Sequence, residues 1–172
     1  MIIREAHPTD AITIAKIQVS VWKQAYKTIF PNEFLQQLSY EDKKNSIQHW
    51  LKNLEENTKV FIAEVESKKN VGFAVGGLER ENNPIYKGEL WGIYVLKKYQ
   101  NIDVGTKLVK KIITHLLNIN ITSMLVWVLK DNPYRNFYEK LKGKIIAEKQ
   151  KVFNGLSREI ISYGWRDIRK IF

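Results

Sequence analysis

A short segment near the middle of the chain has the residue types that bind a phosphate group. An apolar run, Leu90–Val95, is followed by a polar turn and then by the helical pattern of Val104–Leu117, whose second residue is Gly105. The first amides of a helix lack partners within it and carry about half a positive charge, and a glycine lets a ligand approach them closely. The segment therefore predicts a site for a phosphate-bearing ligand or, alternatively, an ordinary helix start that Asp103 caps.

The elements around this turn predict where such a ligand lies. A strand expected over Gly88–Val95, the helix Val104–Leu117 and a buried strand over Met124–Leu129 form a strand–helix–strand unit. Steric rules make the crossover right-handed and its two strands parallel. Ligands of such units bind beyond the carboxyl ends of the strands, and the polar turn after Val95 is at that end.

The periodicity of the rest of the chain predicts helices first and strands later. Residues before position 54 show helical spacing, and later residues show the alternation and turn residues of strands. Helices are expected over about 10–25, where Thr9 or Asp10 is the cap, 32–37 and 40–54, and strands over 2–5, 60–65, 71–78, 144–153 and 157–165.

Turn signals connect these elements. The polar stretch Ser67–Asn70 predicts a hairpin turn, Asn82–Pro84 a second turn, and Asn154–Gly155 the turn of a terminal hairpin. Asn132 followed by Pro133 predicts the cap and first residue of a helix that ends near Gly143.

Composition indicates one compact domain over residues 1–172. The chain is 44% hydrophobic and 12% aromatic, which excludes a disordered protein. The absence of cysteine excludes disulfides and a thiol nucleophile, and His7, His49 and His115 lack the spacing of metal ligands, so no metal is expected. Without a signal-peptide pattern or a long apolar run, we expect a cytoplasmic protein that does not enter a membrane.

The formal net charge of +10 suits an anionic partner, either a nucleic-acid backbone or a small phosphorylated cofactor. The lysines are spread along the chain rather than gathered in a basic arm. Charge alone therefore leaves both classes of partner open, although most of these lysines are expected to be solvated surface residues.

Two motifs together resemble those of the GNAT superfamily of N-acetyltransferases. Tyr99–Val109, which reads YQNIDVGTKLV, is similar to the family's Gln/Arg-x-x-Gly-x-Gly/Ala signature. Asn132–Gly143, which reads NPYRNFYEKLKG, resembles its Asn-containing turn and the Phe-Tyr-Glu-Lys-Leu-Gly segment that follows. The order of expected elements from Ile2 to Trp165 agrees with the family as well. The resemblance implies an α/β fold with a mixed, mostly antiparallel central sheet flanked by helices.

The resemblance also implies a function: transfer of the acetyl group of acetyl-CoA to a primary amine. The strands ending at Val95 and Leu129 would splay to admit the pantetheine arm, and Tyr138 would return a proton to the CoA thiolate. Glu89 matches a strand position that carries the general base in some relatives. The implied cofactor-binding residues are Ile93, Tyr94, Val95, Gln100, Asn101, Ile102, Asp103, Val104, Gly105, Thr106, Asn132 and Tyr138.

Asp103 departs from the family pattern, because it stands where the signature has its first glycine. A carboxylate about 6 Å from a pyrophosphate charge is repelled by roughly 1 kcal/mol in a well-solvated site, which would weaken CoA binding. Alternatively, the side chain turns back to cap its own helix and leaves the later amides free. Lys142 likewise replaces a glycine of the second motif.

Other interpretations of the chain stay open. Tyr138 could be a core aromatic, and Glu89 a solvated or salt-bridged carboxylate. The chain could be a noncatalytic sensor or interaction module that keeps the fold, or, with less support, a basic nucleic-acid-binding domain. The acceptor amine is not readable from the sequence, and a homodimer is expected only because many relatives form one.

Overall fold

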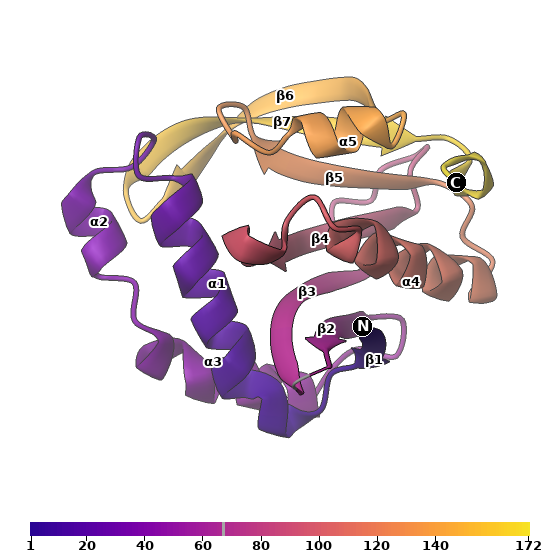
Figure 1. The fold of residues 1–172 in the computed structure, drawn as a ribbon. Coiled ribbons are helices and arrows are strands. Elements are labelled where there is room, and N and C mark those ends of the chain that lie inside the picture. Colours follow the sequence, from indigo (N-terminus) through magenta and orange to yellow (C-terminus); the bar gives the residue numbers. More distant parts are fainter. Residues whose placement is uncertain (67) are drawn as a thin grey trace.

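The computed structural model describes residues 1–66 and 68–172, and it contains a seven-stranded sheet in the order β1-β2-β3-β4-β5-β7-β6 (Figure 1). All neighbouring strands are antiparallel except β4 and β5. The predicted mixed, mostly antiparallel sheet is therefore confirmed. The strands are β1 Ile2–Glu5, β2 Lys59–Val65, β3 Lys69–Leu78, β4 Gly88–Val95, β5 Met124–Leu129, β6 Lys144–Phe153 and β7 Leu156–Trp165.

Helices cover both faces of the sheet (Figure 1). On one face α1, Ala11–Ala25, and α3, Tyr40–Lys52, pack against β2 and β3, with the short α2, Asn32–Gln36, beside them. On the other face lie α4, Val104–Asn118, and the short α5, Asn136–Lys140. No helix in the described residues has the length and apolarity needed to cross a membrane.

An apolar stripe fixes α4 on the sheet. Val104, Leu108, Ile112 and Leu116 recur at helical spacing, and each is at most 1% exposed. They pack in one cluster with Leu90 of β4 and with side chains of β5 and β7. Because the stripe begins at the first residue of α4, the amino-terminal end of the helix is held firmly beside β4.

Strands β4 and β5 separate along their length. They pair only at Gly88 with Met124 and at Glu89 with Leu125, although β4 continues to Val95 and β5 to Leu129. Figure 1 shows the gap between the two ribbons widening toward their carboxyl ends. A register shift in the β3–β4 pairing between Val75 and Gly76 accompanies this divergence, as bulges bend strands. The predicted splay of these strands is thus present in the fold.

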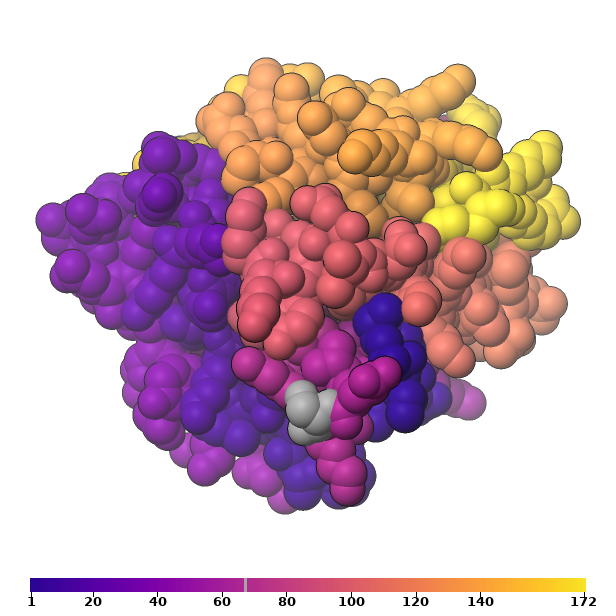
Figure 2. All heavy atoms as spheres, viewed as in Figure 1, coloured from indigo at the N-terminus to yellow at the C-terminus, as the bar shows by residue number. Residues whose placement is uncertain are grey.

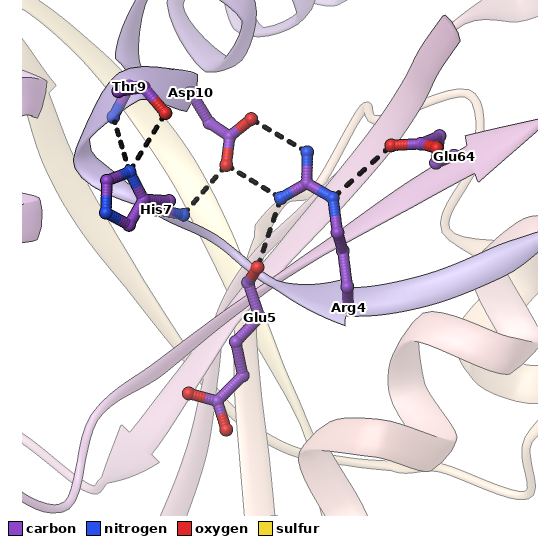
Figure 3. A network of polar contacts seen from close by, with 6 residues as sticks. All are labelled: Arg4, Glu5, His7, Thr9, Asp10 and Glu64. Carbon is purple, nitrogen blue, oxygen red and sulfur yellow. Dashed lines mark hydrogen bonds and ion pairs between the residues drawn. The ribbon is translucent and has the colours of Figure 1, made fainter. Parts of the chain in front are cut away.

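The start of α1 is anchored by charge rather than by a side-chain cap. Asp10 precedes the helix, but its carboxylate makes no cap bond to α1. Instead it accepts two bonds of 2.8 Å from the guanidinium of Arg4, and a third from the amide of His7 (Figure 3). Asp10 thus stands at the expected N-cap position of α1, but it makes no cap bond, because the nearby arginine takes its carboxylate.

One predicted hairpin turn is found as expected, and another is shorter than predicted. Asn154 and Gly155 have positive φ angles of 47° and 82° and join β6 to β7, as their sequence predicts. Strand β3 begins at Lys69, so the turn expected over Ser67–Asn70 is shorter than predicted, and Ser67 itself lies outside the described residues.

The helix expected to begin at Pro133 begins instead at Asn136. The side-chain oxygen of Asn132 accepts the amide of Tyr134 at 2.9 Å, which closes a local turn rather than a helix. The predicted end is correct to within a few residues, since α5 stops at Lys140 and the amide of Gly143 donates to the carbonyl of Tyr138 at 2.9 Å. Between them Lys142 takes a left-handed conformation with φ 64°.

Candidate functional site

A cavity of about 470 Å³ lies where β4 and β5 separate. Its wall is built by the end of β4, the turn and start of α4, the Asn132–Lys140 segment, and one face of α1. In Figure 2 the turn before α4, in salmon, lies between the orange segment that includes α5 and the purple N-terminal helices. A volume of this size is typical of sites for small molecules and cofactors.

The cavity brings together most of the residues that the motifs single out. Side chains or backbone of the following predicted site residues line it: Ile93, Tyr94, Val95, Gln100, Asn101, Asp103, Gly105, Thr106, Asn132 and Tyr138. Three predicted residues are outside this lining, namely Glu89, Ile102 and Val104. Ile102 is 55% exposed to solvent, whereas the side chain of Val104 is buried in the core.

The turn before α4 is held in an unusual backbone conformation. Asn101 and Asp103 both have left-handed φ angles, 61° and 63°, a region that L-residues other than asparagine, aspartate and glycine seldom adopt. The side chain of Gln100 donates to the carbonyl of Val95 at 3.0 Å and ties the turn to the end of β4. Gln100 thereby fixes the turn relative to the strand edge.

Asp103 does not cap its own helix. The residue occupies the N-cap position of α4, but its side chain makes no cap hydrogen bond there. Its backbone carbonyl accepts the amide of Lys107 at 3.0 Å, which leaves the amides of residues 104–106 without partners inside the helix. Of the two alternatives for Asp103, the capping role is wrong, and the residue belongs to the wall of the cavity.

Gly105 serves the packing of two helices. A Cβ atom on this residue would lie 3.2 Å from two ring atoms of Phe137, which is tighter than ordinary contacts. The expectation that the missing side chain leaves room for a pyrophosphate is therefore corrected, because the ring of Phe137 occupies that space. The glycine lets α5 approach the start of α4, and both segments line the cavity.

Four tyrosine side chains line the cavity. Tyr26, Tyr94, Tyr134 and Tyr138 all line it, and the hydroxyl of Tyr26 lies 3.5 Å from the amide nitrogen of Asn132. Tyr138 is 6% exposed, and its ring stacks on that of Tyr163 with centroids 5.6 Å apart. These rings form a wall that is apolar except for its hydroxyl groups.

Burial raises the pKa of two of these tyrosines, Tyr138 and Tyr26. It raises the pKa of Tyr138 well above the ordinary value, and the neighbouring Tyr26 and Tyr94 raise the pKa further. Burial likewise raises the pKa of Tyr26, with smaller contributions from Tyr94 and Tyr134. An ordinary tyrosine is already neutral at neutral pH, and these shifts keep both hydroxyls protonated at higher pH as well, so that each can donate a hydrogen bond.

Glu89 lies away from the cavity and is ion-paired. Its side chain is 2% exposed, and both of its oxygens accept bonds from the guanidinium of Arg80, one of them from Nε at 3.0 Å. The hydrogen bond to Glu89 raises the pKa of Arg80, while burial acts in the opposite direction. The structure thus shows the salt-bridged carboxylate that the sequence left open as an alternative.

Sequence reasoning did not assign several residues of the cavity wall. Val21 and Ala25 are apolar positions at helical spacing in the helix predicted over about 10–25, and Tyr26 follows them. Tyr134, Asn136, Phe137 and Lys140 belong to the second motif, so their place in it was the available signal. Nothing in the local sequence indicates that α1 reaches the cavity, because that contact depends on tertiary packing.

Comparison with known proteins identifies the family. Residues 20–143 match the model of the Acetyltransferase (GNAT) family. The chain is 34% identical over 169 residues to the uncharacterized N-acetyltransferase YuaI of Bacillus subtilis (strain 168), and the match covers 96% of this chain and 93% of that relative.

Solved structures share the fold at low sequence identity. The PaiA N-acetyltransferase from Thermoplasma acidophilum, in complex with coenzyme A, aligns with a TM-score of 0.70 at 19% identity and covers 95% of this chain and 98% of its own. The putative acetyltransferase yncA from Salmonella typhimurium, solved with acetyl-CoA, aligns with a TM-score of 0.68 at 18% identity, covering 96% and 92%. The chain therefore belongs to the GNAT family of acetyltransferases and is an acyltransferase.

Proposed function

We propose that the cavity between β4 and β5 binds acetyl-CoA and that the chain transfers its acetyl group to a primary amine. The observation that carries this proposal is the separation of β4 from β5 directly beside the start of α4. That geometry offers an unpaired strand edge next to free helix amides. Two relatives of the same fold were solved with coenzyme A or acetyl-CoA, which supports the choice of ligand.

In this proposal the pyrophosphate lies at the start of α4. The backbone amides of Val104, Gly105 and Thr106 have no partners inside the helix and point toward its amino-terminal end, where an anion is favoured. Asn101 and Ile102 contribute through the backbone of the turn. Positive charge also comes from Lys140, which lines the cavity, and it offsets part of the repulsion from Asp103.

The pantetheine arm lies along the end of β4. Past Glu89 this edge has no pairing with β5 in the described residues, so the backbone of Ile93, Tyr94 and Val95 can bond the amides of the arm as an added strand would. Gln100 holds the carbonyl of Val95 in place. Asn132, near Tyr26, closes the opposite side of the cavity.

The reaction needs a neutral amine and a stabilised leaving group. The amine lone pair attacks the thioester carbonyl carbon, the carbon–sulfur bond breaks, and the thiolate leaves with its electron pair. The nitrogen then gives up one proton, and the sulfur gains one, so the products are an amide and free CoA. Holding the two reactants together supplies most of the rate.

Tyr138 acts on the leaving sulfur in this proposal. Its raised pKa makes it a weaker acid than an ordinary tyrosine, and a thiol has a pKa near 8.5, so full proton transfer to the thiolate is uphill. The neutral hydroxyl instead donates a hydrogen bond that stabilises the developing thiolate. Solvent can then complete the protonation.

Glu89 does not act as the general base in this proposal. Both carboxylate oxygens are engaged by Arg80, and neither is in the cavity wall. An amine with a pKa near 10.4 is neutral in only about one molecule in 2,500 at pH 7. The neutral amine therefore comes from solution, and its last proton goes to water.

A thiol-release assay with acetyl-CoA and a panel of primary amines tests the proposal. We expect amine-dependent release of free CoA and an acetylated amine detected by mass spectrometry. Acetyl-CoA binding without release for any amine would favour the noncatalytic sensor. No binding by calorimetry, together with no thermal stabilisation at saturating acetyl-CoA, would contradict the proposed site.

A further inference from the structure

A second cavity lies between β4 and helices α1 and α3, on the face of the sheet that these helices cover. Its volume is about 240 Å³, which is about half that of the cavity described above. Its lining includes Trp91 and Tyr94 of β4, Phe73 of β3, and Ile47 and Trp50 of α3. This volume is below the roughly 300–1,000 Å³ of sites for drug-sized ligands, so the cavity suits a smaller molecule.

The two cavities meet at Tyr94, which lines both of them. Its ring stacks on Phe73 with centroids 4.9 Å apart and an interplanar angle of 24°. Helix α1 also borders both cavities, through Gln18 at the second and Val21 at the first. Residues three apart share one face of a helix. A molecule in the second cavity would thus contact Tyr94, which also lines the acetyl-CoA cavity.

The wall of the second cavity carries no charge. Every described residue that lines it is apolar, aromatic or glycine, except for the amide of Gln18 and the hydroxyl of Tyr94. A second ammonium group or a carboxylate placed there would lose its hydration without a charged partner, at a high cost. The wall therefore disfavours polyamines and free amino acids and favours an aromatic body with one polar end.

We propose that this second cavity is the acceptor site and that the acceptor is a small arylalkyl primary amine. This inference rests on the proposed acetyl transfer and names its substrate class. The aromatic body lies among Trp50, Trp91 and Phe73, and the amine nitrogen points toward Tyr94 and the thioester. Gln18 is the polar side chain available to bond the amine. Apolar surroundings also lower the pKa of a bound amine, which favours the reactive neutral form.

The ion pair of Glu89 with Arg80 lies against Trp91, which lines the second cavity. The guanidinium of Arg80 lies over the ring of Trp91, 4.6 Å from its centroid, and is held by Glu89. The indole nitrogen of Trp91 donates to the carbonyl of Leu78 at 3.2 Å. Trp91 is thus fixed before a substrate arrives, which lowers the cost of ordering the site. Glu89 and Arg80 are positioning residues for this wall.

Competing amines test the acceptor class on the purified chain. Thiol release is measured with 2-phenylethylamine, tryptamine, spermidine and alanine at saturating acetyl-CoA. We expect kcat/KM for the two arylalkylamines to exceed that for spermidine and alanine at least tenfold. Tryptophan fluorescence gives a second readout that needs no turnover, because Trp50 and Trp91 line the cavity, and 2-phenylethylamine should change the emission on binding.

A charge introduced into the wall provides a matched pair of variants. Ile47 is half-buried and lines the cavity, whereas Asn45, on the same helix, is exposed and outside it. Ile47→Glu should raise KM for 2-phenylethylamine at least tenfold and lower KM for spermidine, with KM for acetyl-CoA unchanged. Asn45→Glu adds the same charge and should leave all three values within twofold of wild type.

The outcomes separate this inference from the proposed function. Efficient turnover of spermidine or alanine with neither turnover nor binding of arylalkylamines would overturn the acceptor class and leave acetyl transfer standing. Equal effects of Ile47→Glu and Asn45→Glu would overturn the location. Failure of acetyl-CoA to bind would instead remove the proposed function itself. Fluorescence binding of 2-phenylethylamine that Ile47→Glu abolishes would support the cavity even if turnover were slow.

Discussion

At the scale of single residues, Asp103 has the least favourable position in the proposed site. The residue lines the cavity directly before the free amides of α4, and its carboxylate does not cap them. Its backbone is left-handed, with φ 63°, a conformation that aspartate tolerates better than most residues. The position thus keeps the backbone shape that a glycine would give and adds a negative charge beside an anionic ligand.

Replacing Asp103 with asparagine isolates the effect of that charge. Asn tolerates the left-handed conformation, so Asp103→Asn should keep the turn. Removing a repulsion of about 1 kcal/mol should lower the Kd for acetyl-CoA about fivefold, as measured by calorimetry. Asp42→Asn, an exposed position on α3 outside the cavity, makes the same change of net charge and should leave the Kd unchanged. A weaker Kd for Asp103→Asn would show that the carboxylate assists binding.

Tyr138 should affect turnover rather than affinity. Tyr138→Phe keeps the stack on Tyr163 and removes the hydroxyl, so kcat should fall about tenfold while the Kd for acetyl-CoA stays nearly constant. Tyr163→Phe is the control, because Tyr163 is outside the cavity lining and its hydroxyl bonds Glu139. Unchanged kcat for Tyr138→Phe would remove the residue from the chemistry.

At the scale of elements, the chain ends α5 without the usual glycine. Lys142 has φ 64° where helices commonly place glycine, and its Nζ donates to the carbonyl of Lys170 at 3.2 Å. The bond is exposed and contributes little. The left-handed backbone is therefore the larger effect at this position.

A glycine at this position should stabilise the fold. We expect Lys142→Gly to raise the free energy of unfolding by about 0.5–1 kcal/mol in urea titrations, and Tm by about 2–4 °C. Lys142→Ala loses the same side-chain bond without relieving the backbone, so it should not be more stable than wild type. Stabilisation by alanine but not by glycine would contradict this explanation.

The contact between β1 and the start of α1 should show a defined pH dependence. The hydrogen bonds from Arg4 lower the pKa of Asp10 below its ordinary 3.8, and the amide of His7 contributes, whereas burial opposes the shift. A carboxyl whose folded pKa is depressed stabilises the fold above the unfolded pKa, and this contribution is lost as the pH falls through the folded pKa.

Asp10→Asn should therefore lower the free energy of unfolding by about 1 kcal/mol at pH 7, a value that allows for the solvent exposure of Arg4. The difference from wild type should shrink as the pH falls below about 4. Glu5→Gln, which removes the exposed pair with Lys59, should change stability less. A difference that stays constant from pH 7 to pH 3 would exclude the ion pair as its cause.

Local sequence was a good guide to elements and a poorer one to their ends. Asn154–Gly155 specifies its turn by itself, because both residues accept positive φ. Asn132–Pro133 carries the chemistry of a helix cap, but the Asn side chain bonds the amide of Tyr134 in a local turn, and the helix starts at Asn136. Asp10 likewise matches a cap by type and is taken by Arg4 from another element.

At the scale of the whole molecule, the cavity is a product of long-range packing. The motifs single out Gln100, Gly105 and Tyr138, because each lies in a segment with a recognisable pattern, and all three line the cavity. The part of the wall from α1 and the space taken by Phe137 depend on how distant segments meet. Sequence periodicity assigns such residues to the core and does not distinguish a packed face from a cavity wall.

Calorimetric titration of acetyl-CoA into wild type and a matched pair of helix variants tests whether the start of α4 binds the pyrophosphate. Thr106 lines the cavity in the first turn of α4, whereas Thr114 is exposed in its second half. A glutamate in the first turn suits the helix itself, so Thr106→Glu should stay folded. Wild type and Thr114→Glu should bind one acetyl-CoA with similar micromolar Kd, and Thr106→Glu should bind at least about tenfold more weakly. Equal binding by both variants, or no binding by wild type, would contradict the proposed site.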